Sequence, residues 1–136
     1  AMVNFKNGAK GMFWISSVPR GGVYGLKIRI FGSKGSLEWI QNNPGYLKFN
    51  PAKGPVRLLE KGFFGADFSK KFTRVKYGHP EGYLDAFANI YNEFAKFLIT
   101  KKSNQRFYPN EDEGFETAKF IDACKISSKR KKWVKI

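Results

Sequence analysis

An alternating pattern of apolar and charged residues, interrupted by a tight-turn signal, occupies residues 25–40, GLKIRIFGSKGSLEWI. The apolar residues of the first half fall on every second position, as in a strand with one buried face. Residues 32–35 combine two glycines with a serine and a lysine, a composition typical of a turn. The segment therefore predicts two antiparallel strands, residues 26–31 and 36–40.

Turn signals divide the rest of the N-terminal half into further short strands. An Asn-Gly dipeptide at residues 7–8 favours positive φ and predicts a hairpin between residues 3–5 and 10–17. Turns rich in proline and glycine bound two more candidates, residues 46–49 and 56–60. The pattern predicts five or six antiparallel strands.

Apolar side chains fall on both faces of the predicted sheet. Trp14, Phe31 and Ile40 alternate out of phase with the main apolar residues of their strands. An exposed apolar surface favours a covering partner, and we expect a dimer through this second face. Lys27 and Arg29 share that face, so they must lie at its rim or pair with an acid such as Glu38.

Helices are predicted in the second half of the chain. Residues 62–79 show no period and read as a long loop. Apolar spacings of three and four predict a helix from Pro80 to Leu98, and a second is predicted over residues 111–128. Residues 133–136 alternate and predict a closing strand. Strands followed by helices in a chain of 136 residues indicate one α+β domain.

Composition limits the kind of protein this is. The net charge is +14, of which residues 1–59 carry +8 and residues 125–136 carry +6. A single cysteine, Cys124, excludes an internal disulfide, and a single histidine, His79, leaves no ligand set for zinc. Apolar stretches are far shorter than the roughly 18 residues that cross a bilayer. We expect a cytoplasmic domain without a metal or a membrane segment.

Motifs for cofactors and catalysis are missing from the sequence. The glycines do not follow the G-x-G-x-x-G spacing of dinucleotide sites, and no phosphate loop or catalytic triad is present. Residues 61–68 match only the first three positions of an RNA-recognition motif, so nucleic-acid binding is not expected. The alternative function is a self-sufficient basic module that binds RNA or an acidic partner.

Four ordered blocks resemble the C-terminal domain of the Gfo/Idh/MocA family of NAD(P)-dependent sugar and inositol dehydrogenases. They are residues 5–16 (FKNGAKGMFWIS), 25–39 (GLKIRIFGSKGSLEW), 78–95 (GHPEGYLDAFANIYNEFA), and the closing pair 120–123 (FIDA) and 133–136 (WVKI). The resemblance thus spans nearly the whole chain.

This resemblance implies that residues 1–136 are the substrate-binding and oligomerisation part of a larger oxidoreductase. Family members place a Rossmann domain with an E-K-P lysine, and then a histidine or aspartate, before this region. None of these motifs occurs here, so no catalytic residue can be carried over, and the isolated chain should be inactive. The resemblance also implies an open-faced, mainly antiparallel sheet with helices packed on one face, NAD or NADP in the parent enzyme, and a sugar or polyol substrate.

Three residues are candidates for substrate binding. His79 precedes the first predicted helix, where it would either bind ligand hydroxyls or merely cap the helix or pack under the loop. Arg20, in the turn at residues 19–22, would reach an anionic group or remain a solvated turn residue. Tyr24 stands where many relatives carry an asparagine, and this departure leaves the sugar undetermined.

Overall fold

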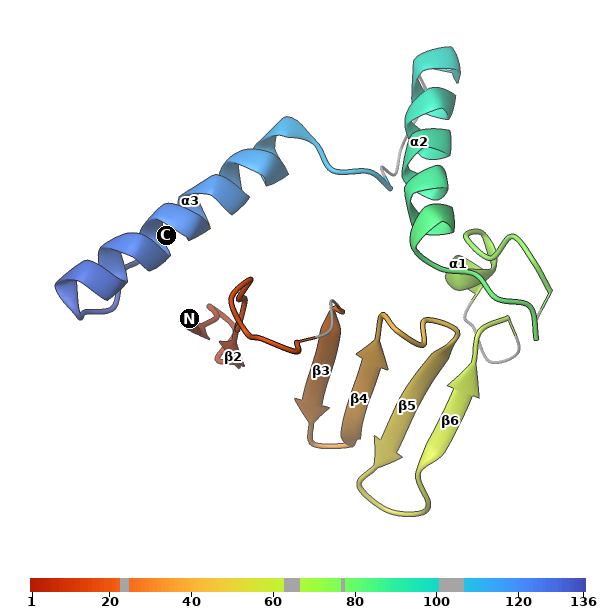
Figure 1. The fold of residues 1–136 in the computed structure, drawn as a ribbon, viewed down its shortest axis with the longest axis horizontal. Helices are drawn as coiled ribbons and strands as arrows, with labels where there is room; N and C mark the ends of the chain where they lie inside the picture. Colours follow the sequence, from red (N-terminus) through yellow and green to blue (C-terminus); the bar gives the residue numbers. More distant parts are fainter. Residues whose placement is uncertain (23–24, 63–66, 77, 101–106) are drawn as a thin grey trace. The chain divides into compact units, whose positions relative to one another are not determined.

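The chain divides into two compact units, each with its own sheet and its own long helix (Figure 1). The first unit joins residues 1–22 to residues 109–136, and the second comprises residues 23–108. The computed structural model describes residues 1–22, 25–62, 67–76, 78–100 and 107–136. Antiparallel sheets and separate helices confirm the predicted open α+β class.

A short hairpin opens the first unit. Strands β1 (Met2–Asn4) and β2 (Lys10–Met12) pair antiparallel, with Val3 opposite Gly11. Gly8 supplies the positive φ of 86° that the turn requires, as the Asn-Gly signal predicts. The hairpin forms a two-stranded sheet of its own, and β2 is shorter than the predicted strand.

Helix α3 (Glu111–Arg130) is the second element of this unit. The Asn110 side chain accepts the N–H of Glu113 at 2.9 Å, and the Glu113 side chain accepts the N–H of Asn110 at 2.9 Å. This capping box satisfies two N–H groups that the helix leaves unpaired. At the other end, Lys131 adopts a left-handed φ of 51° and donates its N–H to Ser127.

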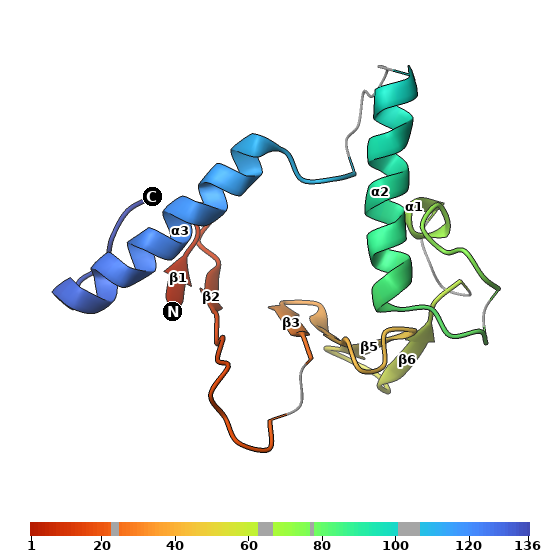
Figure 2. The ribbon, with the colours of Figure 1, turned by 45° about the horizontal axis from the view of Figure 1, so that its top comes forward.

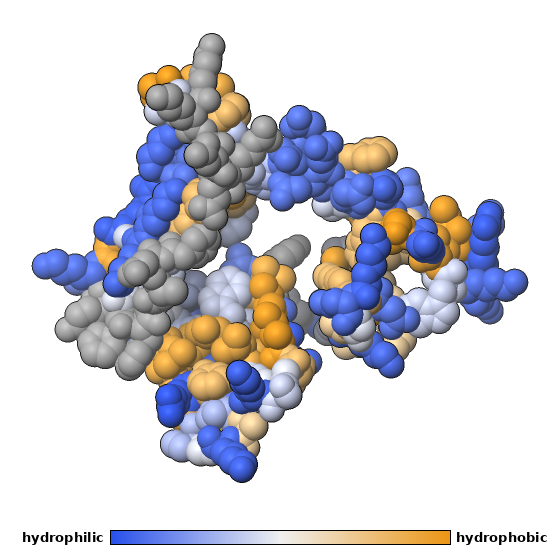
Figure 3. Space-filling view, turned by 180° about the vertical axis from the view of Figure 1, so that it is seen from behind, coloured by the Kyte–Doolittle hydropathy of each residue, from blue (hydrophilic) through white to orange (hydrophobic). Residues whose placement is uncertain are grey.

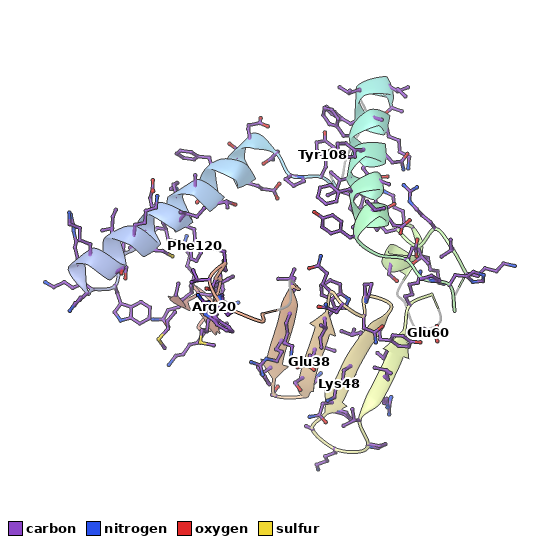
Figure 4. All side chains as sticks on the ribbon, viewed as in Figure 1. Arg20, Glu38, Lys48, Glu60, Tyr108 and Phe120 are labelled. Carbon is purple, nitrogen blue, oxygen red and sulfur yellow. The ribbon has the colours of Figure 1, made fainter. Side chains whose placement is uncertain are left out.

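Aromatic contact joins the hairpin to α3. The rings of Phe13 and Phe120 lie 5.4 Å apart, and Phe120 is labelled in Figure 4. Ala123, on the same helix, is buried. The closing strand predicted for residues 133–136 is wrong, because the described backbone there pairs with no strand after the helix ends.

The capping box yields a first prediction. Asn110→Ala should lower the free energy of unfolding by about 1 kcal/mol, because the Glu113 N–H loses its acceptor. Asn92→Ala is the matched control, since Asn92 is exposed within a helix, where alanine is the better helix former. Thermal unfolding followed by circular dichroism compares the two. Equal melting temperatures for both variants would contradict a stabilising cap.

The second unit is built on a four-stranded antiparallel sheet (Figure 1). Its strands pair in chain order: β3 (Lys27–Gly32), β4 (Gly35–Ile40), β5 (Tyr46–Pro51) and β6 (Arg57–Glu60). Gly35 begins β4 with a φ of 145°, and a Cβ there would lie 2.4 Å from the Asn50 carbonyl oxygen. Only glycine fits this close approach between β4 and β5.

The strand register divides the sheet into two chemically different faces. Paired residues share a face, so the pairs Ile28–Trp39, Leu37–Phe49 and Leu47–Leu59 lie on one side. We call this side the apolar face; its apolar members are Ile28, Ile30, Leu37, Trp39, Leu47, Phe49 and Leu59, and Arg57, the partner of Phe49, lies at its edge on β6. Figure 3, seen from behind, shows apolar side chains gathered over this sheet.

The opposite side, the charged face, combines charged and polar groups with apolar ones; its members are Lys27, Arg29, Phe31, Ser36, Glu38, Ile40, Tyr46, Lys48, Asn50, Leu58 and Glu60. The carboxylate of Glu38 lies 3.8 Å from the ammonium of Lys27. Arg29 and Lys48 flank Glu38 in the register, and Figure 4 labels Glu38 and Lys48 on adjacent strands. Lys27 pairs with Glu38, one of the two arrangements that the sequence predicted for it. Phe31 and Ile40 share this face as predicted, but Trp14 belongs to the first unit and is not part of this sheet.

Two helices follow the sheet in this unit. A short helix, α1 (Asp67–Lys70), interrupts the predicted loop, and α2 (Tyr83–Thr100) begins three residues after Pro80. Figures 1 and 2 both place α1 beside α2. On α2, the rings of Phe94 and Phe97 lie 5.4 and 5.9 Å from the ring of Tyr108. These contacts hold the end of the second unit to its long helix.

Candidate functional site

The connection between β6 and α2 carries the histidine singled out by the sequence. Gly78 has a φ of 78° and donates its N–H to the carboxylate of Glu60 at 2.9 Å. The N–H of His79 donates to the carbonyl oxygen of Lys76 at 3.2 Å, which closes a turn. His79 is exposed. The turn therefore presents an imidazole at the end of the sheet marked by Glu60 in Figure 4.

The start of α2 differs from the sequence prediction. Pro80 and Glu81 precede the helix, and the helix begins at Tyr83. The carboxylate of Asp85 accepts the N–H of Gly82 at 3.0 Å, so a side chain from the first turn caps the backbone just before the helix. His79 thus lies in a turn of its own before the helix.

Glu81 has a role that sequence reasoning missed. Its position near a helix start predicts a favourable interaction with the helix dipole. Instead, one carboxylate oxygen forms an ion pair with Lys61, and the other accepts the backbone N–H of Arg74. The Glu81 side chain is only 8% exposed. No local pattern couples residues 61, 74 and 81, so the sequence carried no signal for this arrangement.

Asn89 on α2 holds the same connection at a second point. Its amide Nδ2 donates to the carbonyl oxygen of Phe72 at 2.9 Å, and its Oδ1 accepts from Arg74 Nε at 2.9 Å. An amide with both a donor and an acceptor can bind two groups of one loop at once. Residues 72–74 are therefore held at two points, by Asn89 on α2 and by Glu81 just before α2.

Glu93 lies further along α2 between two lysines. The ammonium groups of Lys71 and Lys96 lie 2.9 Å from its two carboxylate oxygens. The hydrogen bond from Lys71, followed by that from Lys96, lowers the pKa of the Glu93 carboxyl below its ordinary value of 4.5. Lys71 also lies 3.8 Å from the centre of the Phe107 ring, a cation–π contact.

The lowered pKa of Glu93 gives a prediction with a defined sign. A carboxyl whose pKa falls on folding stabilises the protein above its unfolded pKa, and this contribution disappears as the pH falls through the folded pKa. Glu93→Gln should therefore lower the free energy of unfolding at neutral pH by about 0.5 kcal/mol, as for partly exposed pairs. At acidic pH the difference from the parent protein should vanish.

Denaturant titrations at several pH values measure this difference. Glu116→Gln is the matched control, because Glu116 pairs with Lys119 on the exposed surface of α3 with 62% of its side chain exposed. The control should show a smaller dependence on pH. An effect of Glu93→Gln that stays constant from neutral to acidic pH would contradict the assignment.

Arg20 and Tyr24 are the other two predicted site residues. Arg20 is exposed in a turn of the first unit, where Gly22 donates its N–H to the Pro19 carbonyl at 3.2 Å and Gly21 has a φ of 72°. Figure 4 labels this arginine. Arg20 belongs to the first unit and His79 to the second. Tyr24 falls outside the described residues.

A nucleotide-phosphate site does not fit the described residues. Phosphate groups are bound by free N–H groups at a glycine-rich turn leading into a helix. At the start of α2, the carboxylate of Asp85 accepts the N–H of Gly82. At the start of α3, the carboxylate of Glu113 accepts the N–H of Asn110. Gly8 and Gly35 use positive φ in turns between strands. A nicotinamide cofactor therefore has no cradle in the described part of this chain.

No three histidine, cysteine or acidic residues gather to hold a metal ion in the segments that the structure describes. Among those segments no helix has both the length and the apolar character to span a bilayer. Phe63 and Phe64, the aromatics of the partial RNA-recognition match, lie outside the described residues.

Comparison with known proteins places the chain in one family. The model of the Gfo/Idh/MocA oxidoreductase family, C-terminal α/β domain, matches residues 1–136. The uncharacterized oxidoreductase YfiI of Bacillus subtilis (strain 168) is 34% identical over 130 residues, which cover 90% of this chain and 33% of that protein.

Solved structures agree with this match. An oxidoreductase from Sinorhizobium meliloti is 42% identical with a TM-score of 0.89, over 98% of this chain and 39% of that one. An inositol dehydrogenase homolog from Azotobacter vinelandii, complexed with NADH and myo-inositol, is 32% identical with a TM-score of 0.87, over 95% of this chain and 36% of that one. The chain thus spans about a third to two fifths of the length of these relatives, and it belongs to the C-terminal α/β domain family of the Gfo/Idh/MocA oxidoreductases.

Proposed function

We propose that the chain is the C-terminal substrate-binding and oligomerisation domain of an NAD(P)-dependent sugar or polyol dehydrogenase. One observation carries the proposal: an inositol dehydrogenase homolog solved with NADH and myo-inositol matches 95% of the chain at 32% identity. Cyclic polyols of the inositol type are therefore the first substrates to test. A second structure of that homolog, complexed with NAD+, supports NAD as the first cofactor.

The two tasks of such an enzyme divide between two domains in this proposal. This chain covers only 39% of the Sinorhizobium oxidoreductase, which leaves length for a separate nucleotide-binding domain. The described residues offer no phosphate cradle, so the cofactor and the catalytic groups belong to an N-terminal Rossmann domain. This domain would supply one wall of the substrate cleft.

His79 is the residue that we propose to bind the substrate. The ring nitrogens of an imidazole can form a hydrogen bond with a hydroxyl group of a polyol. The side chain is exposed at a turn held by Glu60, where a ligand can reach it. Arg20 and Tyr24 remain proposed contacts, with Arg20 exposed on the first unit.

The charged face of the sheet is the surface that we propose for oligomer contacts. Phe31 and Leu58 are 74% and 61% exposed there, and burying them would favour association. The Lys27–Glu38 pair offsets part of the repulsion between the basic groups of two copies. Light scattering of the full-length protein should show a dimer or larger species that strengthens with salt. A strict monomer at high protein and salt concentrations would contradict this assignment.

An activity assay of the full-length protein tests the proposed function. Purified protein is offered a panel of polyols and aldoses, each with NAD+ and with NADP+, and formation of the reduced nicotinamide is followed. We expect turnover of at least one cyclic polyol or sugar. The isolated 136-residue chain is the control and should neither turn over substrate nor bind either nucleotide by calorimetry. Micromolar nucleotide binding by the isolated chain would contradict the division between two domains.

A further inference from the structure

We propose that Glu81 is a positioning residue, which sets the turn carrying His79 by tying it to the end of the sheet. The inference rests on the proposed role of His79 in substrate binding. Glu81 itself need not touch the substrate, because its carboxylate is already engaged by two groups of this chain.

The two partners of Glu81 come from the start and from the middle of the connection before α2. Lys61 directly follows β6, and its own backbone N–H donates to the Gly45 carbonyl oxygen at 2.8 Å, in the turn before β5. The other partner, the Arg74 N–H, belongs to the middle of the connection. The carboxylate of Glu81, two positions after His79, thus binds both the end of the sheet and the middle of the connection.

Burial restrains the ion pair between Glu81 and Lys61. The side chains of Glu81 and Lys61 are 8% and 18% exposed, unlike the surface pair of Asp122 and Lys125, which are 71% and 73% exposed. A charge that loses most of its contact with water is stabilised only by retained partners, so this pair resists opening. Exposed pairs exchange freely with water and position little.

Two carboxylates hold the turn of His79 by hydrogen bonds within the described part of the connection. The hydrogen bond from the Gly78 N–H to Glu60 holds the backbone just before His79. The ion pair of Glu81 with Lys61 holds the backbone two positions after His79. His79 therefore lies between two carboxylate anchors, of which Glu81 is the buried one. Losing that anchor frees one side of the turn and reduces the precision with which the imidazole meets a ligand.

Steady-state kinetics of the full-length dehydrogenase test the inference. Glu81→Gln keeps the size of the side chain but removes its charge, and we expect the KM for the polyol to rise about tenfold while kcat changes less than about twofold. Lys61→Met breaks the same ion pair from its other side and should give the same result. The double variant should be no worse than either single variant, because one interaction is lost in all three.

Glu93→Gln is the matched control for stability. It removes the charge of another paired glutamate of the same unit, away from the His79 turn, and should leave KM within about twofold of the parent value. Where Glu81→Gln yields too little folded protein, Lys61→Met carries the test alone.

His79→Ala separates failure of this inference from failure of the proposed function. If His79→Ala leaves KM unchanged, the turn is not a substrate site, and the positioning role fails with it. If His79→Ala raises KM but Glu81→Gln and Lys61→Met do not, the site stands and the positioning role of Glu81 is overturned. A KM increase in all three supports the inference.

Discussion

Leu47→Ser should lower the free energy of unfolding by about 2 to 3 kcal/mol. Leu47 lies on the apolar face between Trp39 on β4 and Leu59 on β6, its partners in the strand register. The substitution removes apolar contacts with both neighbouring strands and places a hydroxyl between two apolar side chains. The expected loss of unfolding free energy is at the lower end of the range for core leucines because Leu47 is half-buried.

Lys48→Ser is the matched control for this prediction. Lys48 is the next residue of β5, exposed on the charged face, and the substitution introduces the same side chain. A surface change of this kind should alter the unfolding free energy by less than about 0.5 kcal/mol. Urea titrations followed by tryptophan fluorescence compare the variants, since Trp39 is the cross-strand neighbour of Leu47. Equal losses for both variants would contradict the assignment of the two faces.

His79→Ala in the full-length protein should raise the KM for the polyol by about 10- to 100-fold, because hydrogen bonds to substrate hydroxyls are lost. The effect on kcat should be smaller, because a group that binds substrate and transition state alike changes mainly KM. Initial rates at saturating nicotinamide measure both constants.

Lys76→Ala is the control for His79→Ala. Lys76 is exposed in the same turn and takes part in it through its backbone carbonyl, which the substitution retains. Its KM should stay within about twofold of the parent value. If the two substitutions change KM equally, the effect comes from disturbing the turn, and the imidazole does not bind the substrate.

Local sequence patterns predicted the four-stranded sheet well. Residues 26–31 and 36–40 were predicted as strands, and β3 and β4 begin and end within one residue of those limits. Alternation and tight turns act over a few residues, so they are legible without knowledge of the rest of the chain. The same alternation assigned Phe31 to the face opposite Ile28.

Features that depend on distant partners were missed. Pro80 can begin a helix, yet the connection instead holds Glu81 against Lys61, twenty positions earlier in the chain, and the helix begins later. Residues 133–136 alternate like a strand, but alternation alone does not supply a neighbouring edge for pairing. Among the site residues, His79 was visible from the sequence as a lone histidine, whereas its supporting groups Glu81 and Asn89 were not.

A crystal structure of the full-length protein with NAD+ and its best polyol substrate would locate both ligands. We predict that the nicotinamide lies in a separate N-terminal domain and that a substrate hydroxyl lies within about 3.2 Å of a ring nitrogen of His79. We also predict that Glu81 keeps its contacts with Lys61 and the Arg74 backbone in that complex. A polyol bound away from the His79 turn, or a nucleotide held by residues of this chain, would contradict these predictions.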